Sequence, residues 1–115
     1  MEFKINGHHW KIVLKNKDEM VNLYKTEYDE EEVYFVGGLT CKPYQWIAIN
    51  EDMNMEMQIK ALKHELTHCY IWEYGLYNVT DFTEEMVCDL VAGINDFVIE
   101  VVDEFKKNYK KMLEG

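Results

Sequence analysis

A short pattern near the middle of the chain combines two imidazoles with a carboxylate. It reads His64-Glu65-Leu66-Thr67-His68, the pattern H-E-x-x-H. In a helix, residues four apart lie one turn apart on the same face, with side chains ~5 to 6 Å apart, so His64 and His68 can bind one metal ion. Glu65 can accept a proton from water that the ion has made more acidic. The pattern therefore predicts a hydrolytic zinc site with Glu65 as the general base.

Chance and ordinary helix structure are the two simpler explanations of this pattern. A shuffled sequence of this composition would contain about 0.02 such matches, so chance explains the pattern poorly. In the structural explanation, His64 and His68 are partly exposed polar residues of an amphipathic helix. They share a face with Met57, Ala61 and Ile71, off the main apolar stripe. We favour the metal site, because the match falls in mid-helix with both histidines on one face.

A catalytic zinc ion needs a third protein ligand and an open position for water. The candidates that follow His68 are Glu73, Asp81, Glu84, Glu85, Cys88 and Asp89. Asp81 and Glu84 form a predicted capping box, while Glu73 points away from the histidines along the same helix. Glu85, in the first turn of the next helix, is left as the third ligand. Its alternative role is that of a charge stabilising a helix N-terminus.

Other side chains near the predicted ion have two interpretations each. Cys88 lies three residues after Glu85, and Cys69 directly follows His68, so either could bind zinc as a thiolate. The alternative, which we favour, is that both are small buried hydrophobic residues. Asp89 either orients a ligating histidine or is a surface carboxylate. A donor to the developing oxyanion is expected as well, and the candidates for it are Tyr70, Tyr74 and Tyr77.

Capping residues and hydrophobic periodicity predict the elements that position this site. They are strands at 2–6 and 9–15, a helix at 17–28, strands at 33–41 and 46–50, and helices at about 54–74 and 86–105. The last helix is apolar on most sides, which predicts burial against the sheet or the preceding helix. No linker or repeat divides the chain, so residues 1–115 are expected to form one α+β domain.

Two further pairs of residues have structural interpretations. His8 and His9 are adjacent in a strand and point to opposite faces, so they are expected at the surface without a shared ion. Gly37-Gly38 has no phosphate-loop context, and we expect a bulge or a close approach of the backbone to a neighbour.

The two motifs together resemble the small zincins of the ImmA/IrrE type. His64-Glu65-Leu66-Thr67-His68 is followed by Glu85-Met86-Val87-Cys88-Asp89-Leu90-Val91-Ala92, similar to that family's E-x-x-A-(N/D)-x-F-A segment. Cys88 and Val91 stand where the family has alanine and phenylalanine. The resemblance covers about residues 17 to 95. It implies a minimal zincin-like fold, with a small antiparallel or mixed sheet, an active-site helix and a following C-terminal helix, and with Glu85 as the third zinc ligand.

Charge and composition narrow the classes of partner. The chain has 12 cationic side chains, all of them lysines, and 22 acidic ones, which gives a net charge of −10. Nucleic-acid binding is not expected, because the chain has no arginine and its net negative charge would repel the phosphates. There is no apolar run long enough for a membrane span or a signal peptide, and the three cysteines are an odd number. We therefore expect a cytoplasmic protein.

These observations predict a zinc-dependent endopeptidase that cleaves flexible segments of a protein substrate. The strand Trp46–Asn50, if it forms the sheet edge, would hold an extended substrate. The resemblance to ImmA/IrrE zincins implies a regulatory protein as substrate and an association with a phage or other mobile element. The alternative is a catalytically silent zincin-fold protein that modulates a host protein by binding.

Overall fold

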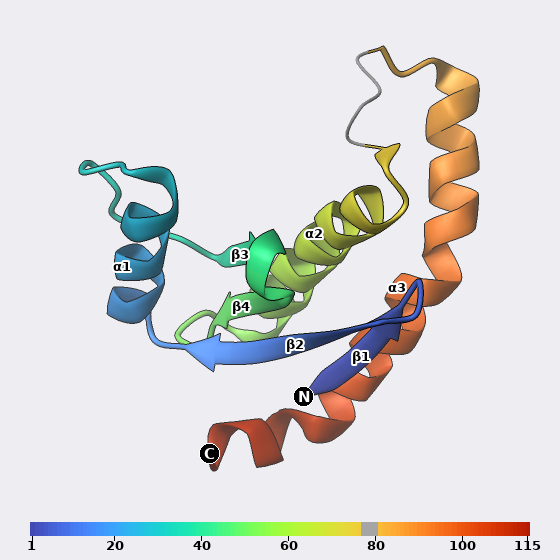
Figure 1. The fold of residues 1–115 in the computed structure, drawn as a ribbon. Helices are drawn as coiled ribbons and strands as arrows, with labels where there is room; N and C mark the ends of the chain where they lie inside the picture. Colours follow the sequence, from blue (N-terminus) through green and yellow to red (C-terminus); the bar gives the residue numbers. More distant parts are fainter. Residues whose placement is uncertain (77–80) are drawn as a thin grey trace.

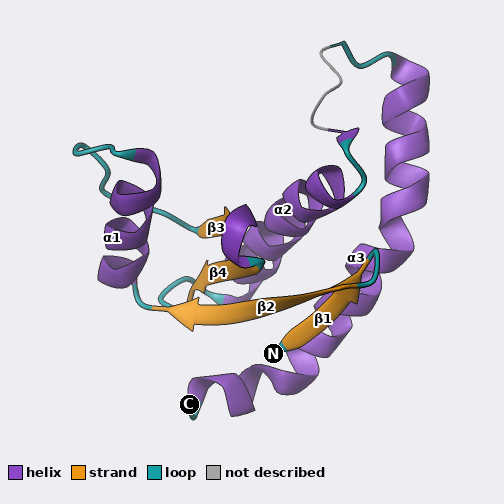
Figure 2. Cartoon of the chain, viewed as in Figure 1, coloured by secondary structure: helices purple, strands orange, loops and turns teal. Residues whose placement is uncertain are grey.

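The computed structural model describes residues 1–76 and 81–115. Within them the elements are β1 (Glu2–Ile5), β2 (His8–Lys15), α1 (Lys17–Tyr28), β3 (Gly38–Cys41), the 3-10 turn η1 (Lys42–Tyr44), β4 (Trp46–Asn50), α2 (Met55–Glu73) and α3 (Glu84–Leu113). The helices lie around one sheet (Figure 1), and the same view coloured by secondary structure separates the two kinds of element (Figure 2). The predicted α+β class is confirmed.

The sheet is mixed, with the strand order β1-β2-β4-β3. Strands β1 and β2 pair antiparallel, as do β3 and β4, whereas β2 and β4 pair parallel. Strand β4 is therefore an interior strand, and the expectation that Trp46–Asn50 forms the sheet edge is wrong. The edge on that side is β3, which lies beside α2.

The N-terminal elements that local sequence signals predicted are present in the structure. The β1–β2 hairpin turns at Asn6 and Gly7, whose φ angles of 50° and 76° are the positive values that such a two-residue turn requires. Helix α1 has the predicted bounds. The Asn16 side chain accepts a hydrogen bond from the backbone N–H of Glu19 at 2.9 Å, and the Glu19 carboxylate accepts one from the Asn16 N–H at 3.1 Å.

The strand predicted at 33–41 is shorter than expected, because only Gly38–Cys41 pairs with β4. The residues just before β3 do not pair as a strand, and hydrogen bonds from Asn50, the last residue of β4, fix their backbone. Its side-chain Nδ2 donates to the Val36 carbonyl at 3.1 Å, and its backbone N–H donates to the Gly37 carbonyl at 2.9 Å. Val36 is buried beneath α1, whereas Phe35 is exposed.

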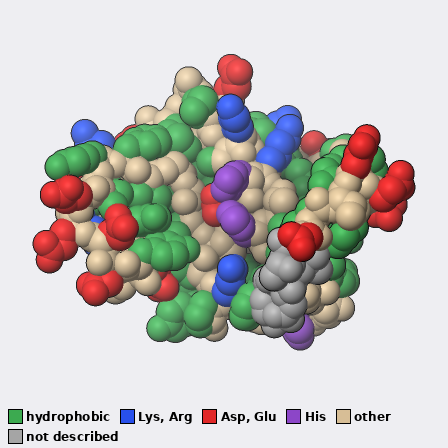
Figure 3. Space-filling view, turned by 90° about the horizontal axis from the view of Figure 1, so that it is seen from above, with side chains coloured by type: hydrophobic (Ala, Val, Ile, Leu, Met, Phe, Trp, Pro, Cys, Tyr) green, Lys and Arg blue, Asp and Glu red, His purple; other side chains and the backbone are tan. Residues whose placement is uncertain are grey.

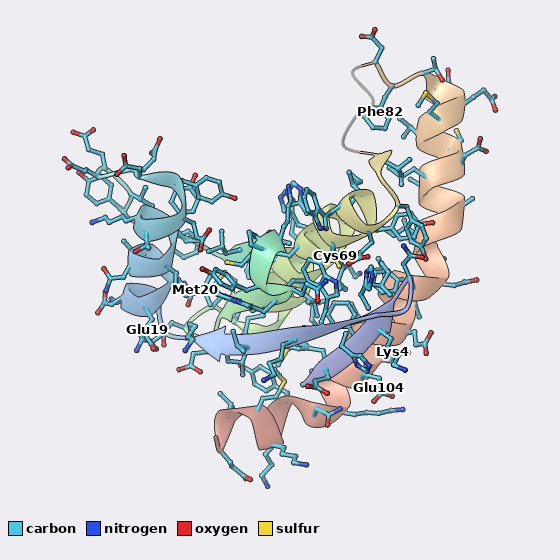
Figure 4. All side chains as sticks on the ribbon, in the orientation of Figure 1. Lys4, Glu19, Met20, Cys69, Phe82 and Glu104 are labelled. Carbon is cyan, nitrogen blue, oxygen red and sulfur yellow. The ribbon has the colours of Figure 1, made fainter. Side chains whose placement is uncertain are left out.

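The start and the burial of α3 differ from the prediction. Thr83, not Asp81, is the N-cap, because its Oγ1 accepts the backbone N–H of Met86 at 3.2 Å. Val87 is exposed, so the helix is not buried against other elements on most sides. In Figure 1 the first turns of α3 rise away from the sheet, and Phe82 beside them also lies away from it (Figure 4).

The core has two parts, one on each face of the sheet. Buried residues of β1, β2 and β4 pack against α2 and the C-terminal half of α3. Because side chains alternate along a strand, Leu39, Cys41 and Ala48 face the other way, where Met20 of α1 covers them. Helices α1 and α2 therefore lie on opposite faces, and β3 forms the edge between them. No helix within the described residues has both the length and the apolar character that crossing a bilayer requires.

Candidate metal centre

Two histidines one turn apart on α2 bring their ring nitrogens together. Nε2 of His64 lies 3.2 Å from Nε2 of His68. Two nitrogens that bind one tetrahedral zinc ion at ~2.0 to 2.1 Å lie about 3.3 Å apart, so the observed spacing fits such an ion. Both side chains are exposed, and within the described residues they form a group with Glu65 in which the candidate ligand atoms lie within 4.8 Å of one another.

The position of this pair follows from the way α2 begins and packs. Asn54 caps the helix, and its side chain accepts the Met57 backbone N–H at 2.9 Å. Leu62, Leu66 and Cys69 are fully buried, with Cys69 between α2 and the sheet (Figure 4). With this stripe on the sheet, the histidine face is turned outward, and Figure 3 shows two adjacent histidine side chains near the middle of one face.

Glu65 lies below the histidines and is 7 % exposed. Thr40 of the edge strand donates a hydrogen bond from Oγ1 to Oε1 of Glu65 at 3.0 Å. The other carboxylate oxygen, Oε2, lies 4.0 Å from Nε2 of His64. One oxygen of the carboxylate is thus fixed by the sheet, and the other faces the histidine pair. This is the arrangement that a general base beside a metal ion requires.

Gly38 leaves the space that the Glu65 carboxylate occupies. A Cβ on Gly38 would lie 2.9 Å from Cγ and 3.0 Å from Oε2 of Glu65, closer than such atoms pack. The predicted close approach of backbone at Gly37-Gly38 is therefore confirmed, and the neighbour is the candidate general base.

Burial shifts the pKa values of two groups of the site in opposite directions. It raises the pKa of Glu65, against the smaller effects of the Thr40 hydrogen bond and of His64. It lowers the pKa of His68, and the nearby His64 and Lys42 lower it further. A higher pKa makes Glu65 a better proton acceptor, and a lower one keeps His68 neutral and able to bind a metal ion.

A cleft of ≈ 360 Å³ opens around the site. It is lined by Tyr24, Tyr28, Gly38, Leu39, Thr40, Lys42, His64, Glu65 and His68. These residues come from α1, β3, η1 and α2, so the cleft lies along the edge strand. In Figure 3, acidic side chains gather at the two sides of this face, over α1 with its following loop and over the start of α3.

The residues proposed as a third ligand lie outside this group. Glu85 is in the first turn of α3 and is exposed, and it is not among the three residues that form the ligand group in the described chain. Cys88 is exposed too, which contradicts its interpretation as a buried hydrophobic residue, whereas Cys69 is buried as expected. Asp89 is also exposed.

The tyrosines of the cleft are not those considered from the sequence. Tyr70 packs its ring against Tyr74 and Phe97, at centroid distances of 4.6 and 6.1 Å, and neither Tyr70 nor Tyr74 lines the cleft. Tyr77 lies outside the described residues. Tyr24 and Tyr28 line the cleft instead. Their spacing along the chain indicated an amphipathic helix, and only the packing of α1 beside β3 gives them this second role.

Glu73 points away from the histidine pair, as predicted. Its side chain is 3 % exposed and accepts hydrogen bonds from Nε1 of Trp10 at 2.7 Å and from Nδ1 of His8 at 2.6 Å. It therefore ties the end of α2 to the N-terminal hairpin. His8 and His9 are both exposed, as expected for surface residues.

Comparisons with known proteins identify no relative of this chain. No protein-family model, no curated protein and no solved structure matches the chain.

Proposed function

We propose that the protein is a zinc-dependent endopeptidase of the zincin type. The observation that carries the proposal is the 3.2 Å separation of the Nε2 atoms of His64 and His68, beside a buried carboxylate on the same helix. A core helix needs neither two imidazoles in contact at the surface nor a glutamate buried beneath them. Hydrolysis of a peptide bond uses both.

His64 and His68 would hold the ion, with Glu85 as the third ligand. Zinc supplies Lewis acidity, which polarises the substrate carbonyl and makes water easier to deprotonate. Glu65 accepts the proton of the attacking water, and Thr40 keeps the carboxylate in position for this step. The glutamate then delivers that proton to the departing amine.

The third ligand is the part of this proposal that has competing candidates. Exposure of Glu85 and Cys88 on the first turns of α3 leaves both accessible to an ion. We retain Glu85, because carboxylate completes the H-E-x-x-H set in the zincins that the sequence resembles. Zinc content of the variants Glu85→Ala and Cys88→Ala decides between them, since the true ligand is the one whose loss empties the site.

The substrate in this proposal is a flexible, extended segment of a protein. This segment would pair with β3 rather than β4, because β3 is the edge strand beside the site and one row of its backbone N–H and C=O groups faces away from β4. A cleft of ≈ 360 Å³ accommodates a few side chains and not a folded partner. The resemblance to ImmA/IrrE zincins makes a regulatory protein of a phage or other mobile element the natural substrate.

One observation favours the alternative, a silent zincin-fold protein that acts by binding. The ligand group in the described chain holds two histidines and Glu65 but no separate third ligand. An ion held by two histidines alone would be bound weakly. Such a protein would modulate its partner through the same cleft without cleaving it.

The variant Glu65→Gln tests the proposal against this alternative. We expect it to keep its zinc, because both histidines remain, and to lose hydrolysis of an unfolded protein such as reduced casein. Zinc content by elemental analysis and product formation by mass spectrometry are the two readouts. Hydrolysis that survives in Glu65→Gln would overturn the mechanism, and casein left intact by the zinc-loaded wild-type protein would favour the binding role.

A further inference from the structure

Lys42 brings a positive charge to the wall of the candidate active site. It lines the cleft with His64, Glu65 and His68. The chain as a whole has only 12 lysines against 22 acidic residues. Within the described part of the chain, the ion pairs at 4.0 Å or less involve other residues and leave Lys42 without a carboxylate. Its charge is therefore available to an anion that enters the cleft.

The lysine side chain is held in position and does not extend freely into water. Nζ lies 5.4 Å from the centre of the Trp72 ring on α2, and the residue is half-buried. A cation over an aromatic face is attracted by the ring electrons, which restricts the ammonium group to this side of the cleft. An ammonium restricted in this way loses less entropy on binding a carboxylate than a free one does.

Lys42 also has a defined place relative to the reacting groups. Glu65 contacts β3 at Gly38 and Thr40, and Lys42 follows directly after the last residue of this strand. Lys42 begins the 3-10 turn η1, two residues after Thr40, so it lies where the edge strand ends.

The direction of an added strand gives the cleft a polarity. An antiparallel strand is the more stable partner for an edge, and β3 already pairs in this way with β4. A peptide antiparallel to β3 passes Lys42 first and the region of Thr40 and Gly38 afterwards. Its side chains near Lys42 therefore precede, in its own sequence, the bond that lies beside Glu65.

We propose that Lys42 is a specificity-determining residue, which binds an acidic side chain of the substrate on the N-terminal side of the bond beside Glu65. The inference rests on the proposed peptidase function and names the class of its substrate. Preferred substrates are extended segments with aspartate or glutamate a few residues before the scissile bond. The charge of the protein otherwise repels acidic segments, so this local cation decides where they bind.

Digestion of a pool of short randomised peptides by the zinc-loaded protein tests the proposal, with cleavage sites mapped by mass spectrometry. We expect acidic residues to be enriched before the cleaved bond, the enrichment to vanish in Lys42→Met, and basic residues to replace acidic ones in Lys42→Glu. Lys63→Met is the matched control, because Lys63 is an exposed lysine beside His64 that does not line the cleft. It should keep the wild-type preference.

Kinetics on single peptides separate recognition from catalysis. For a peptide with glutamate at the enriched position, Lys42→Met should raise KM about 5-fold and leave kcat unchanged, as for one half-exposed ion pair. An equal fall of kcat for acidic and neutral peptides would assign Lys42 to the oxyanion and overturn the proposal. Absence of acidic enrichment, or enrichment only after the cleaved bond, would overturn it as well.

Binding to Glu65→Gln distinguishes failure of this proposal from failure of the peptidase function. Fluorescence polarisation of dye-labelled glutamate and lysine versions of one peptide needs no turnover. If the wild-type protein cleaves nothing, but Glu65→Gln binds the glutamate version about 5-fold more tightly and Lys42→Met removes the difference, carboxylate selection stands without the hydrolase. Equal affinities for the glutamate and lysine versions would overturn the proposal that Lys42 selects acidic side chains, whether or not cleavage occurs.

Discussion

Thr40 and Glu65 are joined by a buried hydrogen bond, with Oγ1 of the threonine donating to Oε1 of the glutamate at 3.0 Å. The bond connects the edge strand to the helix that bears both histidines. It fixes one oxygen of the carboxylate and leaves the other facing His64. In the proposed function, strand β3 would therefore have two roles: it would position the general base and bind the substrate.

Loss of this hydrogen bond should lower the rate of hydrolysis without emptying the zinc site. Thr40→Val keeps the shape of the side chain and removes the donor, so kcat should fall about 10- to 100-fold, as for the loss of one hydrogen bond to a charged group. Thr40→Ser restores the hydroxyl and should recover most of the activity. Equal rates for the valine and serine variants, at equal zinc content, would show that the bond does not position Glu65.

Neighbouring glycines provide a second test of the same carboxylate. Gly38→Ala places a Cβ 2.9 Å from Cγ of Glu65 and must displace it, whereas Gly37→Ala meets the flexible Met53 side chain no closer than 3.4 Å. We expect Gly38→Ala to lose hydrolysis and Gly37→Ala to keep it, with similar zinc content in both. The account of the cleft is contradicted if the two variants are equally active.

The three cysteines should differ in reactivity. Burial raises the pKa of Cys41 to about 11, and burial likewise raises the pKa of Cys69, while Cys88 is exposed. Since a raised pKa keeps a thiol protonated at all pH values below it, iodoacetamide at mildly alkaline pH should alkylate Cys88 alone. Peptide mapping checks this.

The alkylated protein also identifies the third ligand. If Glu85 binds the ion, protein alkylated at Cys88 keeps its zinc. Release of zinc on alkylation would instead identify the Cys88 sulfur as a ligand.

Glu73 should matter for stability and not for chemistry. Glu73→Ala removes the acceptor of Trp10, whose buried indole N–H is then unpaired, at a cost of about 1 to 3 kcal/mol in the free energy of unfolding. Denaturation by urea measures the loss. Asp103→Ala, an exposed acidic residue of α3 without an ion pair in the described structure, is the control and should change stability little. Equal losses in the two variants would refute an anchoring role for Glu73.

The parts of the fold that local signals determine were predictable from the sequence. The capping box of Asn16 and Glu19 gave the start of α1, and Asn6-Gly7 gave the first hairpin. The start of α3 was misassigned to Asp81, because the caps at Asp81 and Thr83 differ by only two residues and either residue type caps well.

The site could be predicted only where its residues share one helix. His64, Glu65 and His68 follow from helical spacing, but Thr40 lies 25 residues before Glu65, and no local pattern connects them. The same holds for Lys42, which reaches the cleft because β3 is the edge strand. That place depends on the parallel pairing of β2 with β4, which hydrophobic pattern alone does not specify.

The most direct test of the central claim is the zinc content of the protein purified without added metal or chelator and then offered zinc. Elemental analysis should give about one zinc per chain for the wild-type protein, with the zinc lost in His68→Ala and lost or sharply weakened in Glu85→Ala. A wild-type protein that takes up no zinc would contradict the account. In that case the contact between the two imidazoles would be a feature of the helix surface alone.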